Sequence, residues 1–339
     1  MIPGRRSFLK QLALSGLLAP FAPRLLSAQD ATKVRVQIGW IPNVQYAGEW
    51  VALEDGLMAE QGLDVEWYPG GPNALPSPVV LAAGNADLGY STWFPFLDAV
   101  RQGNDLVMIG AVFPHNPLGI ISLASRPILE PKDIVGARIL AQGQNEKTAI
   151  DTTLTLAGLP VDWTQVPAGF SPEPLLAGDG DGYTAFSTNQ TITLEQMGLE
   201  WDKDFHFVSF DELGFRSFGA VLLTTRRYLE ANRPTVVAYL RGLINGWDRN
   251  EADPAYAARL AVETYGADFG LELAQQIRQN ELQIPLTRYR DLDLPRLSLD
   301  RDVILGPLFT AARATGREDL PDVDAIADFS IVAEAHSGL

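Results

Sequence analysis

Short strand patterns alternate with helix patterns between residues 33 and 141, and this order restricts the possible folds more than any other feature of the sequence. Apolar and polar residues alternate over residues 33–39 with the period of two that is typical of a strand. Apolar residues then recur at helical spacing from Tyr46 to Leu57. Further strand patterns cover residues 63–68, 86–90, 105–112 and 137–141. Strands that alternate with helices predict βαβ units and a parallel sheet.

The alternation restarts after Pro127 and Pro131, which suggests a second α/β unit. A strand pattern at residues 181–186 belongs to this unit, and the apolar run at residues 218–224 predicts a strand that returns from it. Helix patterns dominate after Arg227. We therefore predict an α/β protein with two α/β lobes.

The first 28 residues have the features of a cleavable export signal. Arg5 and Arg6 form a twin-arginine pair, a short apolar stretch follows, and the small residue Ala28 marks a cleavage site. The stretch is shorter than the roughly 20 residues of a membrane-spanning helix, and no later stretch approaches that length. We expect residues 1–28 to be a twin-arginine signal peptide, and the mature protein to be periplasmic and not itself membrane-spanning.

Charge and composition exclude several classes of function. The formal net charge is −16, and residues 1–28 hold four bases and no acid, so the mature chain carries −20. Such a balance opposes binding to nucleic acid, which needs basic patches. The sequence has no cysteine, which excludes disulfides, thiolate metal sites and cysteine nucleophiles.

Several short motifs occur in an order that resembles a known family. They are 39-GWIPN-43, 46-YAG-48, 54-EDGL-57, 61-QGLDV-65, 81-LAAGNADLG-89, 117-PLGIIS-122, 131-PKDIVG-136, 188-TNQ-190 and 218-FGAVLLTT-225. They resemble the substrate-binding proteins related to the thiamine-pyrimidine-precursor synthases and receptors, which are neighbours of the sulfonate, taurine and nitrate receptors. The likeness runs from Lys33 to about Gly246.

The resemblance implies a type II periplasmic-binding-protein fold with two α/β lobes joined by hinge strands. Lobe 1 would comprise residues 29–125 plus 219–339, and lobe 2 residues 126–218. It also implies the solute-binding component of an ABC importer, which delivers its ligand to a permease in the inner membrane. The eukaryotic synthases of this fold use a cysteine-rich iron-binding segment, and the absence of cysteine argues against that activity here.

The ends of the predicted strands select the candidate ligand-binding residues. In parallel α/β sheets, ligands bind beyond the carboxyl ends of the strands. Aromatic side chains at these places suit a flat ring, and amides or an imidazole could bond its nitrogens. The aromatic candidates are Trp40, Tyr46, Tyr90, Trp93, Phe113, Phe170, Tyr183 and Phe186. The polar candidates are Asn43, His115, Gln142, Asn145, Asn189 and Gln190.

These candidates favour a small planar heterocycle, such as a thiamine pyrimidine precursor, as the ligand. The loops at residues 40–46 and 90–94 contain no Lys or Arg, whereas an acidic ligand needs concentrated donors. Lys147 and Arg216 keep an alkyl sulfonate or taurine-like anion open as an alternative, and riboflavin is another. No nucleophile motif, metal-ligand cluster or phosphate loop is present, so we expect no metal, no cofactor and no enzyme activity. A periplasmic enzyme on the same fold is the less favoured alternative.

Overall fold

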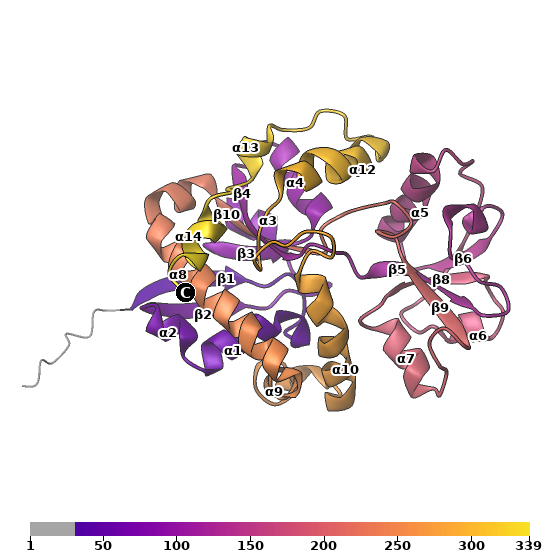
Figure 1. Ribbon diagram of the computed structural model, residues 1–339, viewed down its shortest axis with the longest axis horizontal. Helices are drawn as coiled ribbons and strands as arrows, with labels where there is room; N and C mark the ends of the chain where they lie inside the picture. Colours follow the sequence, from indigo (N-terminus) through magenta and orange to yellow (C-terminus); the bar gives the residue numbers. More distant parts are fainter. Residues whose placement is uncertain (1–30) are drawn as a thin grey trace, which may run out of the picture. The chain divides into compact units, whose positions relative to one another are not determined.

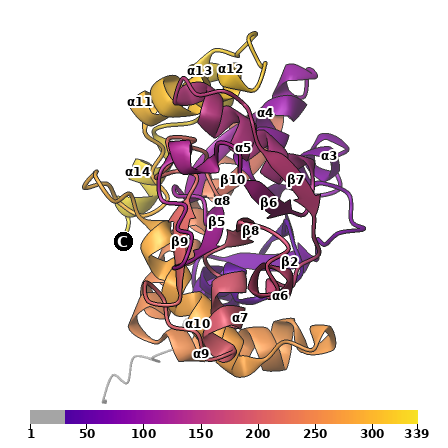
Figure 2. The same ribbon diagram turned by 90° about the vertical axis from the view of Figure 1, so that its right-hand side faces the viewer.

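A computed structural model describes residues Ala31–Leu339. The predicted signal peptide and its twin-arginine pair lie outside the described residues. The strands form two five-stranded sheets, each with mixed parallel and antiparallel pairing (Figures 1 and 2). The predicted α/β class is confirmed.

The first sheet has the strand order β2-β1-β3-β10-β4. Its strands are β1 (Thr32–Gln37), β2 (Leu63–Tyr68), β3 (Leu88–Ser91), β4 (Leu106–Phe113) and β10 (Ala220–Thr225). β1 pairs in parallel with β2 and β3, whereas β10 lies antiparallel between β3 and β4. The returning strand predicted at residues 218–224 is therefore confirmed.

The second sheet has the order β7-β6-β8-β5-β9. Its strands are β5 (Leu118–Leu123), β6 (Arg138–Ala141), β7 (Thr164–Pro167), β8 (Gly182–Phe186) and β9 (Phe205–Ser209). β6 pairs in parallel with β7 and β8, and β5 is antiparallel to β8 and β9. All its strands lie within residues 118–209, and Figure 2 shows β5, β6, β8 and β9 facing the viewer.

The strand pairing differs from one predicted lobe boundary. We placed residues up to 125 in lobe 1, but β5 bonds to β8 and β9 of the second sheet. Residues 114–117 therefore lead from the first sheet to the second, and residues 210–219 lead back. The predicted boundary assigned β5 to the wrong lobe, because a run of apolar residues does not indicate which sheet the strand will join.

Helices and short helical turns fill most of the remaining chain. Up to residue 196 they are η1 (Val44–Tyr46), α1 (Ala47–Glu54), α2 (Leu57–Glu60), α3 (Ser77–Ala82), α4 (Trp93–Arg101), η2 (Pro131–Ile134), α5 (Gln144–Leu156), α6 (Glu173–Leu176) and α7 (Gln190–Gln196). After β10 they are α8 (Arg226–Ala252), α9 (Pro254–Leu260), η3 (Ala261–Tyr265), η4 (Ala267–Phe269), α10 (Leu273–Gln283), η5 (Ile284–Thr287), α11 (Arg301–Val303), η6 (Ile304–Leu308), α12 (Phe309–Ala314), α13 (Val323–Ile326) and α14 (Ile331–His336).

Both faces of the first sheet are buried, as β4 shows. Val107 and Ile109 belong to one apolar cluster, while Leu106 and Met108 belong to another, because successive side chains of a strand point to opposite faces. Helix α8 lies in the first cluster and touches α1 closely. A Cβ atom on Gly246 would stand 2.0 Å from the carbonyl oxygen of Gly48, so only glycine permits this approach.

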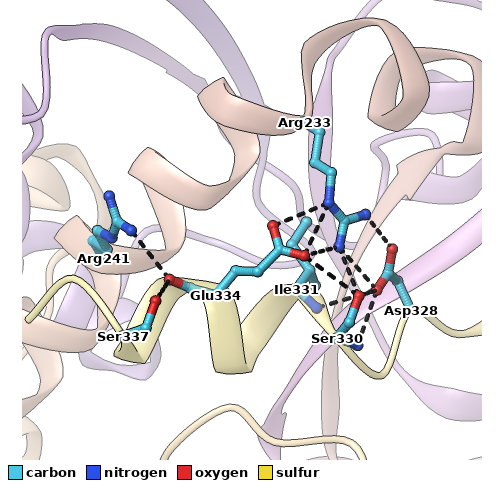
Figure 3. A network of polar contacts seen from close by, with 7 residues as sticks. All are labelled: Arg233, Arg241, Asp328, Ser330, Ile331, Glu334 and Ser337. Carbon is cyan, nitrogen blue, oxygen red and sulfur yellow. Dashed lines mark hydrogen bonds and ion pairs between the residues drawn. The ribbon is translucent and has the colours of Figure 1, made fainter.

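An ion-pair network ties the end of the chain to α8 (Figure 3). The Arg233 guanidinium donates to Asp328, with Nη1 to Oδ2 at 2.6 Å, and to both carboxylate oxygens of Glu334. Arg241 donates to the Glu334 carbonyl oxygen, at 3.1 Å. In Figure 1, α14 accordingly lies beside α8 and the first sheet.

Candidate functional site

The segment that follows β1 is fixed from both sides, and its Trp40 is 39% exposed. The Asn43 side chain accepts a bond from the Gln45 amide, at 2.9 Å, so it caps the turn η1. Helix α10 holds the same turn, since Gln276 accepts from the Val44 amide and Gln283 donates to the Val44 carbonyl. Trp40 is thus a large exposed apolar side chain on a well-anchored segment.

Four predicted aromatic residues near the first sheet pack in its core instead. Tyr46 is 2% exposed, and its ring meets that of Tyr90 edge to face, with centroids 5.2 Å apart. Phe113 meets Trp247 in the same way, at 5.9 Å. Trp93 is fully buried, because α4 turns Trp93, Phe96 and Leu97 toward the sheet. These four rings are therefore buried in the described structure, and their role as ligand contacts stays a prediction.

A buried carboxyl group lies among these tyrosines, and our candidate set lacked it. Glu49 of α1 is fully buried, and its Oε2 accepts bonds from the hydroxyls of Tyr90, at 2.9 Å, and Tyr239. Within residues 31–339, Oε1 has no partner, and neither has the buried Tyr46 hydroxyl. Burial disfavours the charged form and raises the pKa of Glu49 to about 7. The glutamate three residues after Tyr46 on a helical pattern was the available signal.

Gln142 and Tyr183 organise the loop after β7 in the second sheet. The Gly169 carbonyl accepts from the Tyr183 hydroxyl, at 2.7 Å, and from the Gln142 amide, at 3.4 Å. Gln142 also donates to the Thr184 carbonyl and accepts from the Thr184 hydroxyl. These bonds occupy both ends of the Gln142 amide, and Tyr183 is fully buried. Phe170, the residue after Gly169, is 76% exposed.

The end of β8 has a similar arrangement. The Phe186 amide donates to Gln190 Oε1, at 2.9 Å; Phe186 is 41% exposed and Gln190 is buried. Asn189 is exposed and precedes α7 without a capping side-chain bond. Asn145 is also exposed and lies inside α5, whose N-cap is Gly143.

His115 stabilises the passage between the two sheets. Its Nδ1 lies 2.6 Å from Asp211 Oδ2, and its Nε2 accepts from the Arg290 amide, at 3.1 Å. Both ring nitrogens have partners within the described chain and the side chain is buried, so its predicted ligand contact stays a prediction. Asn116 continues the contact between the crossing segments, donating to Ser217 Oγ at 3.0 Å.

The two cations that kept an anionic ligand open both have carboxylate neighbours. Lys147 pairs with Asp151 one helical turn further along α5. Arg216 Nε lies 3.5 Å from Asp211 Oδ1, although it makes no hydrogen bond within the described chain. Among residues 31–339, no three His, Asp or Glu side chains are placed to hold a metal ion. No helix in that range is long and apolar enough to cross a membrane.

The structure thus divides the predicted aromatic residues into two groups. Trp40, Phe170 and Phe186 combine a position at a strand end with an exposed ring. Tyr46, Tyr90, Trp93, Phe113 and Tyr183 are buried. We take these exposed rings, with the polar groups Asn43 and Asn189, as the candidate site residues.

Comparisons with known proteins agree with this fold. The model of the NMT1/THI5-like family matches residues 43–257. A formylaminopyrimidine-binding protein of Halalkalibacterium halodurans is 24% identical over 77% of this chain and 79% of its own length. A 4-amino-5-hydroxymethyl-2-methylpyrimidine phosphate synthase of Legionella pneumophila is 26% identical over 49% of this chain and 53% of its own length.

Solved structures show the same architecture. The periplasmic aliphatic sulphonate binding protein SsuA from Escherichia coli superposes with a TM-score of 0.61 at 17% identity, over 86% of this chain and 94% of that one. The alkanesulfonate-binding protein SsuA from Xanthomonas axonopodis pv. citri, bound to MOPS, gives 0.56 at 20% identity, over 90% and 97%. The chain has the fold of the periplasmic substrate-binding proteins of ABC importers and belongs to the NMT1/THI5-like family.

Proposed function

We propose that this protein is the periplasmic receptor of an ABC importer and that it binds a small planar heterocycle, such as a pyrimidine precursor of thiamine, without converting it. The observation that carries the proposal is the exposure of Trp40, Phe170 and Phe186 at strand ends of both sheets. Exposed rings on anchored segments are suited to stack on a flat ligand. The name of the Halalkalibacterium relative points to the same ligand class.

The polar groups agree with a neutral ligand. Asn43 uses its side-chain oxygen within the turn η1, which leaves its amide nitrogen without a bond among the described residues. Asn189 is exposed, and the cations Lys147 and Arg216 have carboxylate neighbours. Such a site offers hydrogen bonds to ring nitrogens rather than a concentrated positive charge.

Titration calorimetry tests the ligand class with three probes: 4-amino-5-hydroxymethyl-2-methylpyrimidine, riboflavin and MOPS. We expect measurable binding of the pyrimidine and none of MOPS. Binding of MOPS alone would favour a second candidate function, a sulfonate receptor. The buried Arg216 Nε, which makes no hydrogen bond within the described chain, supports that candidate. Mass spectrometry should recover the bound pyrimidine unchanged, and any conversion of it would contradict the receptor proposal.

The export route and the lobe division belong to the same proposal. A twin-arginine signal at residues 1–28 would deliver the protein to the periplasm. Two lobes would close around the ligand there. They follow the predicted division into residues 29–125 plus 219–339 and residues 126–218, with the boundary at 125 moved to residues 114–117. Replacing Arg5 and Arg6 by lysine should retain the protein in the cytoplasm. Undiminished periplasmic protein after cell fractionation would contradict that route.

A further inference from the structure

One ion pair joins a helix of the C-terminal group to a helix of the second sheet. Arg278 of α10 meets Glu195 of α7 with two parallel bonds, Nε to Oε2 at 3.0 Å and Nη2 to Oε1 at 2.9 Å. The side chains are 40% and 26% exposed. Glu281, one turn along α10, lies 3.4 Å from Arg278 Nη1 and helps to orient the guanidinium.

Each of these helices also holds a segment of the candidate site. Helix α10 grips the turn after Trp40, because Gln276 and Gln283 bond the Val44 backbone. Helix α7 begins at Gln190, whose side chain accepts from the Phe186 amide. The segments of Trp40 and Phe186 are therefore connected through α10, the Arg278–Glu195 pair and α7.

We propose that Arg278 and Glu195 form a positioning pair that sets the arrangement of the two site segments and thereby the affinity for ligand. The part about affinity rests on the proposed function. A bidentate pair demands a defined orientation of both partners, so it resists relative rotation of the helices more than a single contact does. Neither residue touches ligand in this proposal, and both act through α10 and α7.

The first test needs no ligand. The chain has no cysteine, so Ala59→Cys on α2 and Val161→Cys before β7, both exposed positions, accept a spin-label pair that reports one distance between the two sheets. We expect Arg278→Glu or Glu195→Arg to broaden this distance distribution, and the double exchange Arg278→Glu with Glu195→Arg to narrow it again. Distributions of the single variants that match the wild type would overturn the proposal.

The second test measures affinity for 4-amino-5-hydroxymethyl-2-methylpyrimidine. We expect each single charge reversal to weaken binding about 5- to 10-fold, since a half-exposed pair is worth little and the reversal adds repulsion of similar size. The charge exchange should recover the wild-type affinity to within about twofold, which a merely local packing role would not produce. Failure of the exchange to restore affinity would contradict the pair's role.

A matched control uses the pair Arg301–Asp324, which is also bidentate and exposed but joins α11 to α13. Arg301→Glu should leave both the distance distribution and the affinity unchanged. If the wild-type protein binds none of the pyrimidine, the proposed ligand fails, whereas the distance measurement still decides whether the pair orders the two sheets.

Discussion

The strand ends of the two sheets use aromatic residues differently. At the first sheet, Tyr46, Tyr90, Trp93 and Phe113 are buried, and Trp40 alone of the predicted rings there stays exposed. At the second sheet, Tyr183 is buried while Phe170 and Phe186 are exposed. The C-terminal helices explain the contrast, because α8 packs in the same cluster as Tyr46, Tyr90 and Phe113, and Phe309 of α12 packs against Trp93.

The difference shows that residue type at a strand end does not by itself determine whether a ring is exposed. The aromatic rings at the strand ends of the first sheet contribute mainly to the stability of the fold. The second sheet holds its loops through side-chain bonds to backbone, from Gln142, Tyr183 and Gln190, and leaves its phenylalanines uncovered. Substitutions in the two regions should therefore change different quantities.

The largest expected effect is on stability, at Trp93. Trp93→Ala should lower the free energy of unfolding by about 3–5 kcal/mol, because it empties a fully buried site packed against Phe218 and Phe309. Phe170→Ala, at an equally aromatic but exposed position, should change it by less than about 0.5 kcal/mol. Urea denaturation of both variants measures these changes. Equal losses of unfolding free energy would contradict the difference between the two regions.

The next effect is a pH dependence from Glu49. Its folded pKa of about 7 exceeds the ordinary value of 4.5, so the folded state keeps a proton that the unfolded state releases. Stability from this group is complete below pH 4.5, falls as the pH rises toward 7, and is lost above it, by on the order of 3 kcal/mol. Glu49→Gln should remove this decline.

The measurement is urea denaturation of wild type and Glu49→Gln at several pH values between 4 and 8. The exposed Glu60→Gln provides the control and should keep the wild-type profile. The groups facing Glu49 are the hydroxyls of Tyr90 and Tyr239, with Tyr265 also nearby, and none of them ionises in this range. Parallel profiles for wild type and Glu49→Gln would show that the carboxyl is already neutralised in another way.

Replacing Trp40 should change the affinity for ligand more than it changes the free energy of unfolding. Loss of stacking and of buried apolar area predicts that Trp40→Ala weakens binding of the pyrimidine by about 2–3 kcal/mol, or roughly 30- to 150-fold. Calorimetry measures the change, with Leu129→Ala as a control at an exposed apolar position away from the strand ends. Binding within twofold of the wild type, with an intact circular dichroism spectrum, would remove Trp40 from the site.

The smallest expected effect concerns Gln142, which acts through the Phe170 loop. Gln142→Ala removes one of the two bonds to the Gly169 carbonyl and should weaken binding by about 1 kcal/mol, roughly fivefold. The same substitution in a Phe170→Ala background should have little further effect, because the ring that it positions is gone. Additive losses in the double variant would mean that Gln142 acts by another route.

Most of the fold follows from local patterns, and the exceptions have a common cause. Four strands that pair in parallel were predicted at residues 33–39, 63–68, 86–90 and 137–141. Each observed strand begins and ends within a few residues of the predicted range. β7 and β9 were missed as strands. β7 is short and ends at Pro167, and the apolar run of β5 was placed in lobe 1 although it pairs in the second sheet. Their pairing depends on distant partners, which local periodicity does not contain.

The candidate site was predictable in position but not in exposure. The rule that ligands bind beyond strand ends led to Trp40, Phe170 and Phe186. The same rule led to Tyr46 and Trp93, which are buried because segments far along the chain, such as Tyr239 and Phe309, cover the first sheet. Whether a ring is covered is settled by tertiary packing.

The placement of β10 between β3 and β4 has a consequence for how the chain folds. β3 and β4 cannot be joined until residues 220–225 have been made, whereas the second sheet is complete once residue 209 has emerged. Contacts close in sequence form faster than distant ones, and chains made from the N-terminus can fold by units. The second sheet should therefore form first, while one edge of β3 and the strand β4 remain without their partner β10 and open to a chaperone.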